Sequence, residues 1–189
     1  MLLVFAGLPS PAAAETSVDV TDMRLERSDD GVFLSAHVDF DLPAIVEAAM
    51  LKGIAVHFVT EAEISRERWY WYDRKVAAAA RYARLAYQPL TRRWRLNVSP
   101  EPIGSTGLGL TLGQSFDSLQ EALASVQRIA RWRIGEPGDV EPGSTNRVQL
   151  RFRLDTSQLP RPIQIGVAGQ PDWSLGTTRN ERLVAEAAR

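Results

Sequence analysis

The sequence contains no cysteine, which excludes a thiol nucleophile, a disulfide framework and a thiolate metal site. Only two of its 189 residues are histidines, so acid–base chemistry has few candidates. Beyond the N-terminal residues, no apolar run approaches the roughly 20 residues that a membrane-spanning helix needs. The net charge of -1 gives no general attraction to nucleic acid or to an anionic membrane. Electrostatic recognition must therefore be local.

The first residues have the features of an export signal. Apolar side chains dominate positions 2–8, and the small residues Ala12 and Ala14 suit cleavage before Glu15. The basic residues that open a complete signal are missing, which indicates a signal peptide truncated at its N-terminus. We expect residues 1–14 to be this signal peptide and residues 15–189 to form a single β-rich domain in the periplasm. Export also argues against a nucleic-acid partner.

Alternating apolar and polar residues predict that most of the chain forms strands. Val32, Leu34 and Val38 share one face of a strand whose other face carries Ser35 and His37. The same period predicts strands over residues 54–64 and 148–154, and shorter strands over 18–27, 76–87, 94–98, 108–112 and 163–167. One buried and one wet face are typical of antiparallel sheets. We expect a mainly β (α+β) fold, an antiparallel β-sandwich of immunoglobulin-like character with two helices packed on it.

Helical spacing of apolar residues interrupts this pattern. We expect helices over residues 42–50 and 118–130, and a short final helix over 180–188. Asp41 is the expected N-cap of the first helix, and Gly53 its stop. Ser118 and Glu121 have the spacing of a capping box at the start of the second.

One cluster of residues could support catalysis. His37, Asp39 and Asp41 alternate along a strand face, which would point an imidazole and two carboxylates at a common proton or metal. The alternative is a solvated strand face that runs into a helix cap. His57 shares its face with two glutamates and has the same two interpretations. We expect no metal site and no cofactor, and an enzyme is the less favoured interpretation.

The segment from Arg66 to Arg95 combines charge with aromatic residues. It holds nine basic and two acidic residues, a net charge of +7, around the sequence WYWY. Arginine recognises carboxylates and phosphates bidentately, and aromatic rings provide large contact areas at low entropic cost. The candidate binding residues are Arg66, Arg68, Tyr70, Tyr72, Arg74, Arg81, Arg84 and Arg92. The alternative is that Trp69 and Trp71 belong to the core and the arginines form a solvated face.

Several motifs here and elsewhere resemble one known family. They are RERWYWYDRKVA at 66–77, RLAY at 84–87, LTR at 90–92, QSF at 114–116, LDTSQLP at 154–160 and DW at 172–173. Together they resemble the exported proteobacterial proteins grouped as domain of unknown function 4390, over about residues 18–175. The resemblance implies one exported domain and supplies no activity, cofactor or catalytic residue. It also implies a link to envelope signalling, with a membrane sensor kinase as a partner.

Three functions remain open. We favour an exported binding or interaction module that holds a protein, a peptide or an envelope polymer through the basic aromatic segment. The first alternative is a hydrolase that uses His37, Asp39 and Asp41. The second is a carrier of an apolar ligand between the sheets. The residues that line any cavity distinguish these functions, because carriage of an apolar ligand needs apolar walls and catalysis needs converging titratable groups.

Overall fold

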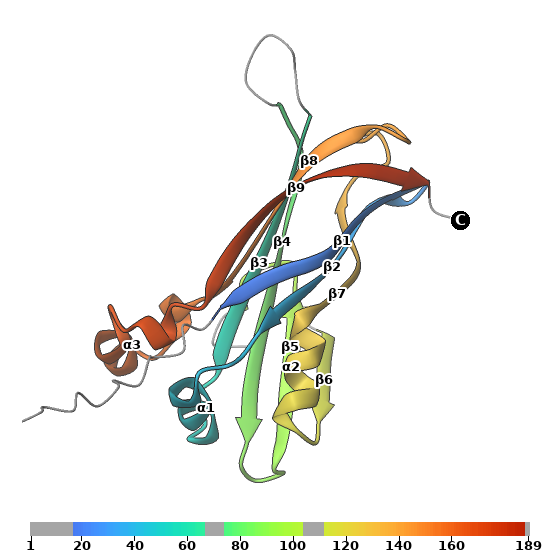
Figure 1. The fold of residues 1–189 in the computed structure, drawn as a ribbon. Helices are drawn as coiled ribbons and strands as arrows, with labels where there is room; N and C mark the ends of the chain where they lie inside the picture. The colour runs from blue at the N-terminus through green and yellow to red at the C-terminus, as the bar shows by residue number, and fades with distance from the viewer. Residues whose placement is uncertain (1–16, 67–73, 104–111, 188–189) are drawn as a thin grey trace, which may run out of the picture.

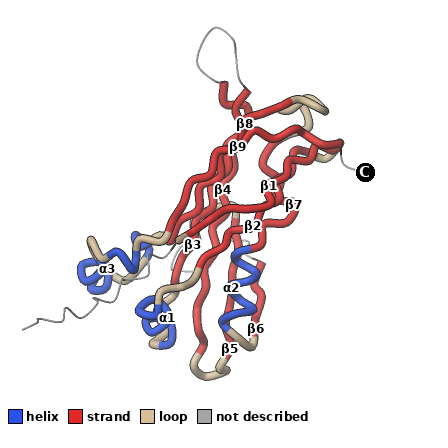
Figure 2. Tube along the Cα trace, in the orientation of Figure 1, coloured by secondary structure: helices blue, strands red, loops and turns tan. Residues whose placement is uncertain are grey.

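The computed structural model describes residues 17–66, 74–103 and 112–187, and most of them lie in β-strands (Figure 1, Figure 2). The strands are β1 (Val18–Ser28), β2 (Gly31–Phe40), β3 (Val56–Arg66), β4 (Arg74–Gln88), β5 (Arg93–Ser99), β6 (Leu112–Phe116), β7 (Arg128–Gly135), β8 (Thr145–Leu154) and β9 (Gly176–Ala187). The helices are α1 (Ala44–Leu51), α2 (Leu119–Gln127) and α3 (Arg161–Val167), with short 3-10 helices η1 (Thr156–Gln158) and η2 (Pro171–Trp173).

All nine strands join in one mixed sheet with the order β6-β5-β4-β3-β8-β9-β1-β2-β7. Neighbours are antiparallel except β1 and β9, which run parallel where residues 25–27 meet residues 185–187. The sheet curls into a half-barrel, and β7 at one edge comes close to β4 in the opposite half (Figure 1). The two edge strands, β6 and β7, are joined in sequence by α2.

The mainly β class is confirmed, but the immunoglobulin-like sandwich is not. The described strands form one curled sheet, where the sandwich predicts two stacked sheets, and β1 and β9 break the expected antiparallel pattern. The reason is physical. A sheet that curls over its own concave face buries alternate residues in the same way as two facing sheets, so the period of two cannot separate these arrangements.

The core fills the concave face of the half-barrel. Phe40 of β2, Phe58 of β3 and Phe152 of β8 are buried there, with ring centroids 5.1 to 5.7 Å apart. β2 lies four positions from β3 in the sheet, so these rings meet across the curl. Burial of large aromatic side chains and their offset stacking both favour the curled form.

The first predicted helix is confirmed as α1, with a different start. The helix begins after Pro43, which makes no side-chain cap hydrogen bond, so the prediction of Asp41 as N-cap is wrong. The helix starts there because the carbonyl oxygen of Pro43 accepts hydrogen bonds from the backbone N–H groups of Val46 and Glu47, at 2.9 and 3.1 Å. Gly53 follows the helix with a φ of 89°, as expected of a residue that ends a helix in the left-handed region.

The second predicted helix is confirmed as α2 but ends earlier than expected. The Ser118 side chain accepts a hydrogen bond from the backbone N–H of Glu121, as the capping motif predicts. The helix stops at Gln127, and the apolar Ile129 belongs to β7, a strand that the sequence pattern did not indicate. Arg131 in this strand has a φ of 42°, and the β2–β7 register shifts beside it. The bulge breaks the alternation by which a strand is identified.

Two predictions near the C-terminus are wrong. Residues 163–167 belong to α3 instead of a strand, since Pro160 and Pro162 stand at a helix start and five residues with three apolar side chains are too few to separate the two periods. The predicted helix over residues 180–188 is the strand β9, which pairs with β8 along most of its length. Pairing with a central strand outweighs the helical propensity of its alanines and glutamates.

The strand predicted over residues 108–112 lies outside the described residues except for Leu112, where β6 begins. Trp69 and Trp71 lie outside the described residues as well. No helix in the described part of the chain is long and apolar enough to cross a membrane.

Candidate functional site

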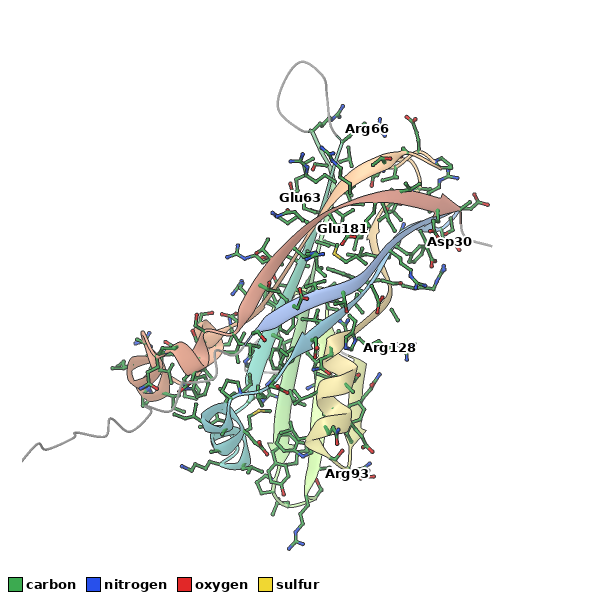
Figure 3. The ribbon with its side chains drawn as sticks, in the orientation of Figure 1. Asp30, Glu63, Arg66, Arg93, Arg128 and Glu181 are labelled. Carbon is green, nitrogen blue, oxygen red and sulfur yellow. The ribbon has the colours of Figure 1, made fainter. Side chains whose placement is uncertain are left out.

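The structure spreads the predicted binding residues along β4. Arg68, Tyr70 and Tyr72 lie outside the described residues, while Arg66, Arg74, Arg81, Arg84 and Arg92 lie within them. Arg66 pairs with Arg74 at one end of the β3–β4 hairpin, and its guanidinium lies 3.5 Å from Glu141. Arg92 lies in the turn beyond the other end of β4, a strand of 15 residues. Such a strand is about 50 Å long, and Figure 3 shows Arg66 near one end of it and Arg93, which follows Arg92, near the other. These residues therefore cannot contact one small ligand together.

Arg81 lies on the concave face of β4, whereas Arg84 lies on the convex face. The residues of β4 on that face alternate as Ala77, Ala79, Arg81, Ala83 and Leu85, opposite the buried face of β3. Arg81 pairs directly with Thr60, which is buried. Its neighbours along this face, Ala79 and Ala83, are too small to fill the space beside it. A single long cationic side chain therefore lies among small residues inside the curl.

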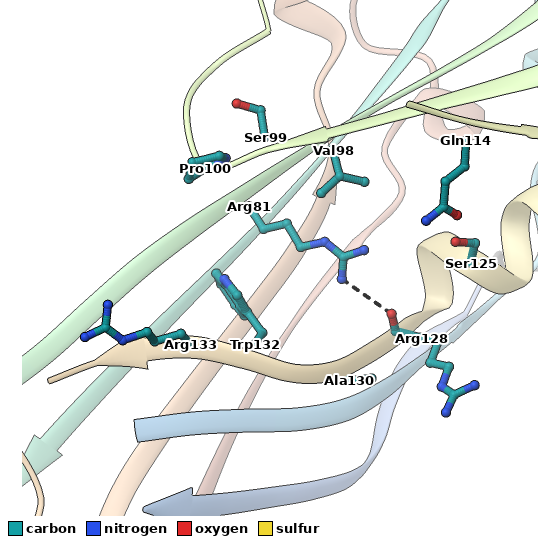
Figure 4. Close-up of a pocket in the computed structure, with 10 residues that line it drawn as sticks. All are labelled: Arg81, Val98, Ser99, Pro100, Gln114, Ser125, Arg128, Ala130, Trp132 and Arg133. Carbon is teal, nitrogen blue, oxygen red and sulfur yellow. Dashed lines mark hydrogen bonds between the residues drawn. The ribbon is translucent and has the colours of Figure 1, made fainter. Parts of the chain in front are cut away.

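An open cavity of about 530 Å³ surrounds Arg81 (Figure 4). It is lined by Arg81, Val98, Ser99, Pro100, Gln114, Ser125, Arg128, Ala130, Trp132 and Arg133. These residues come from β4, from β5 and the residue after it, from β6, from α2 and its C-cap, and from β7. Three arginines and no Asp or Glu are present among the described residues of this lining. The volume falls in the range of small-molecule sites, and the charge favours an anion.

The close approach of β7 to β4 produces one side of the cavity. Gly135, at the end of β7, lies against β4, where an added Cβ would come within 2.9 Å of the Cβ of Ala77. Towards the start of β7, Arg81 bridges the same two strands through the backbone of Arg128. Between these two contacts the strands are not paired in the sheet, which leaves the cavity open.

The guanidinium of Arg81 has little electrostatic compensation. Its Nη1 donates to the carbonyl oxygen of Arg128 at 3.4 Å, and no carboxylate of the described residues forms an ion pair with it. Burial lowers the pKa of Arg81, because removal from water disfavours the charged form. An arginine nevertheless keeps its proton at neutral pH. The cavity thus holds a permanent, half-desolvated cation to which the described residues provide no counter-charge.

Further hydrogen-bond donors lie beside this cation. Gln114 on β6 and Ser125 on α2 project into the part of the cavity where the Arg81 guanidinium ends (Figure 4). Neither side chain hydrogen-bonds to another residue within the described ranges. An amide, a hydroxyl and a guanidinium that face one space form a donor set suited to a carboxylate or a phosphate.

The histidines provide no comparable arrangement. His37 is half-buried, and Asp39 and Asp41 are exposed along the strand face away from the core. Within the described ranges, no group of three or more histidine and carboxylate side chains could hold a metal ion. This geometry gives no specific support to the hydrolase alternative.

His57 lies on the convex face of β3 opposite Arg84, and its buried Nδ1 has no hydrogen-bond partner among the described residues. Burial, assisted by the charge of Arg84 and opposed by that of Asp155, lowers the pKa of His57 from 6.5 to about 4. The imidazole is therefore neutral at pH 7, and it lies on the opposite face of the sheet from the Arg81 cavity.

Sequence reasoning selected Arg81 but missed its partners in the cavity. Gln114, Ser125 and Trp132 lie outside the basic aromatic segment, and neither charge nor motif spacing joins them to it. Only the curl of the sheet brings β6, α2 and β7 beside β4. The lone arginine within the alanine-rich run at 77–83 is visible in the sequence, but this run does not show which face of the strand is buried.

Comparison with known proteins identifies the family and no individual relative. Neither the curated proteins nor the solved structures contain a match to the chain. A family model matches residues 15–182, which is most of the chain. The resemblance found in the motifs is thereby confirmed, and the chain belongs to the family described as Domain of unknown function (DUF4390).

Proposed function

We propose that this protein is a binding module that holds the anionic group of its ligand at Arg81, in the cavity between β4, β6, α2 and β7. The observation that carries the proposal is the half-desolvated guanidinium of Arg81, which has one neutral hydrogen-bond partner and no carboxylate among the described residues. A buried charge is costly unless it is paired. A site that keeps such a charge unpaired is best explained by a partner that arrives as a ligand.

The walls of the cavity indicate the character of this ligand. Val98, Pro100 and the half-buried Trp132 provide apolar surface beside the polar end formed by Arg81, Gln114 and Ser125. An anionic head with an apolar body would satisfy both parts. The guanidinium of Arg81 favours such a ligand over a purely apolar one, so the cavity supports anion binding more strongly than carriage of an apolar ligand.

The cellular setting belongs to the same proposal. The apolar N-terminal run with its small-residue cleavage site supports export of the mature chain to the periplasm. A module that binds an anionic ligand there could report its presence to a membrane sensor, which is consistent with a role in envelope signalling.

Calorimetric titration with a matched pair of probes tests the binding proposal. N-acetylphenylalanine carries a carboxylate and an aromatic body, and N-acetylphenylalaninamide differs only in lacking the charge. We expect the acid to bind wild type at least about tenfold more tightly than the amide, since a charge-assisted hydrogen bond contributes about 1.5–3 kcal/mol. Arg81→Met should remove this preference. Arg84→Met, on the opposite face of the same strand, should retain it.

Two further anions test whether N-acetylphenylalanine fails to bind only because its shape does not fit the cavity. Octanoate offers a carboxylate on a flexible chain, and phenyl phosphate offers a dianionic head. If none of the three anions shows binding that depends on Arg81, the proposed function is wrong.

A further inference from the structure

The free edge of β7 faces the cavity. β7 is the last strand of the sheet and pairs only with β2 among the described strands. The carbonyl oxygen of Arg128, at the first position of β7, points to the side away from β2 and accepts the hydrogen bond of Arg81 (Figure 4). Backbone groups on this side of β7 therefore border the same space as the Arg81 guanidinium. An unpaired strand edge is a template for an additional strand.

The dimensions of the opening limit what can be added. A new strand lies about 4.8 Å from its neighbour and sends alternate side chains to the two faces. At the end of β7, the contact of Gly135 with β4 leaves no room between the two strands. Only the part of β7 that borders the cavity is therefore accessible to an added strand. With β7 spanning eight residues and a register shift beside Arg131, the accessible edge suits a segment of about four to six residues.

The charge of this edge selects the partner. β7 has the sequence RIARWRIG, with three arginines and no acidic residue. Arg131 pairs with Glu26 and Arg133 with Glu136, whereas Arg128 and Arg81 form no ion pair with a carboxylate of the described residues. Basic side chains on an edge repel a basic strand, including a second copy of β7. An acidic segment is complementary to this edge.

We propose that the ligand of this cavity is an extended acidic peptide segment, which adds to the free edge of β7 as a strand and places one carboxylate on Arg81. This inference rests on the proposed function and names the ligand class for the same site. An inward-facing Glu or Asp of the added strand reaches Arg81, Gln114 and Ser125, and an adjacent apolar residue on the same face packs on Trp132. The backbone of the peptide supplies affinity, and the carboxylate supplies specificity.

Selection from a displayed library of random dodecapeptides tests the inference. The library is panned in parallel on wild type, Arg81→Met and Arg84→Met. We expect wild type and Arg84→Met to enrich peptides that carry one acidic residue within a run of β-branched or aromatic residues, and Arg81→Met to lose this enrichment. The best peptide is then synthesised with a fluorophore, and its affinity is measured by polarisation.

Two changes to that peptide separate its charge from its backbone. Replacing the acidic residue by its amide should weaken binding at least tenfold to wild type and have little effect on binding to Arg81→Met. Methylation of alternate backbone nitrogens leaves every side chain in place but removes the strand hydrogen bonds. It should abolish binding in one of the two alternating patterns and be tolerated in the other, because only one set of N–H groups faces β7.

Each outcome has a definite meaning. If no acidic peptide is enriched, or if both methylation patterns are tolerated, strand addition is wrong. When N-acetylphenylalanine nevertheless binds through Arg81, the proposed anion site stands and only the peptide inference falls. When neither peptide nor small anion binds in an Arg81-dependent way, both proposals fall.

Discussion

Replacing Arg81 by methionine should leave the fold as stable as wild type or make it slightly more stable. Methionine keeps the apolar stem of the side chain and removes the guanidinium. The change breaks one hydrogen bond, the 3.4 Å contact to the Arg128 carbonyl, which contributes at most about 1 kcal/mol. It also removes the desolvation cost of a half-buried cation that has no carboxylate partner among the described residues, which is about 1–2 kcal/mol, since full burial costs several. The net change in the free energy of unfolding should lie between about 0 and +2 kcal/mol.

The assay is urea unfolding followed by tryptophan fluorescence and by far-UV circular dichroism. Coincidence of the two transitions establishes a two-state process, and an unchanged m-value shows that the variant is equally compact. An arginine that holds β4 and β7 together would behave differently, because its loss would cost about 2 kcal/mol or more. A destabilisation of that size would refute the view that Arg81 is kept for a ligand.

Three further predictions concern the fold. The pKa of His57 is lowered to about 4 in the folded protein, so as the pH falls the unfolded chain binds a proton before the folded chain does. The free energy of unfolding should therefore drop by about 1–3 kcal/mol between about pH 6.5 and pH 4. His57→Gln should reduce this pH dependence, measured by urea unfolding at each pH. Gly135→Ala should destabilise by about 1–3 kcal/mol through its contact with Ala77, whereas Gly138→Ala, with nothing within 4 Å, should be nearly neutral in thermal unfolding. Phe152→Ala should cost about 3–5 kcal/mol in chemical unfolding, and a cost below about 1 kcal/mol would contradict its place in the aromatic core.

Strand alternation predicted the parts of the fold in which strands are regular. β2 and β8 each bury every second residue, so the pattern identifies both strands, although β8 begins at Thr145, ahead of the expected start at residue 148. β7 was missed because its bulge at Arg131 places Ile129 and Trp132 out of period, directly after a capped helix. Sheet order could not be predicted, since the pairing of β1 with β9 joins segments more than 150 residues apart.

The candidate site could likewise be predicted only in part from the sequence. The basic aromatic segment contained Arg81, but its alanine neighbours on both faces of β4 gave no sign of which face was buried. Only the pairing with Thr60 and the curl of the sheet place Arg81 inside. Composition can thus identify a charged segment, whereas the desolvation of one charge within it depends on tertiary structure.

The most direct test of the central claim is the NMR signal of the Arg81 side chain during ligand titration. In a ¹H–¹⁵N spectrum of the wild-type protein, the Nε–H resonance that disappears in Arg81→Lys belongs to Arg81. Addition of N-acetylphenylalanine should shift this resonance saturably, while N-acetylphenylalaninamide leaves it in place, because a carboxylate that binds the guanidinium changes its hydrogen bonding. If the acid and the amide shift it equally, or if neither does so while other arginine resonances respond, Arg81 does not receive the anionic group and the account is contradicted.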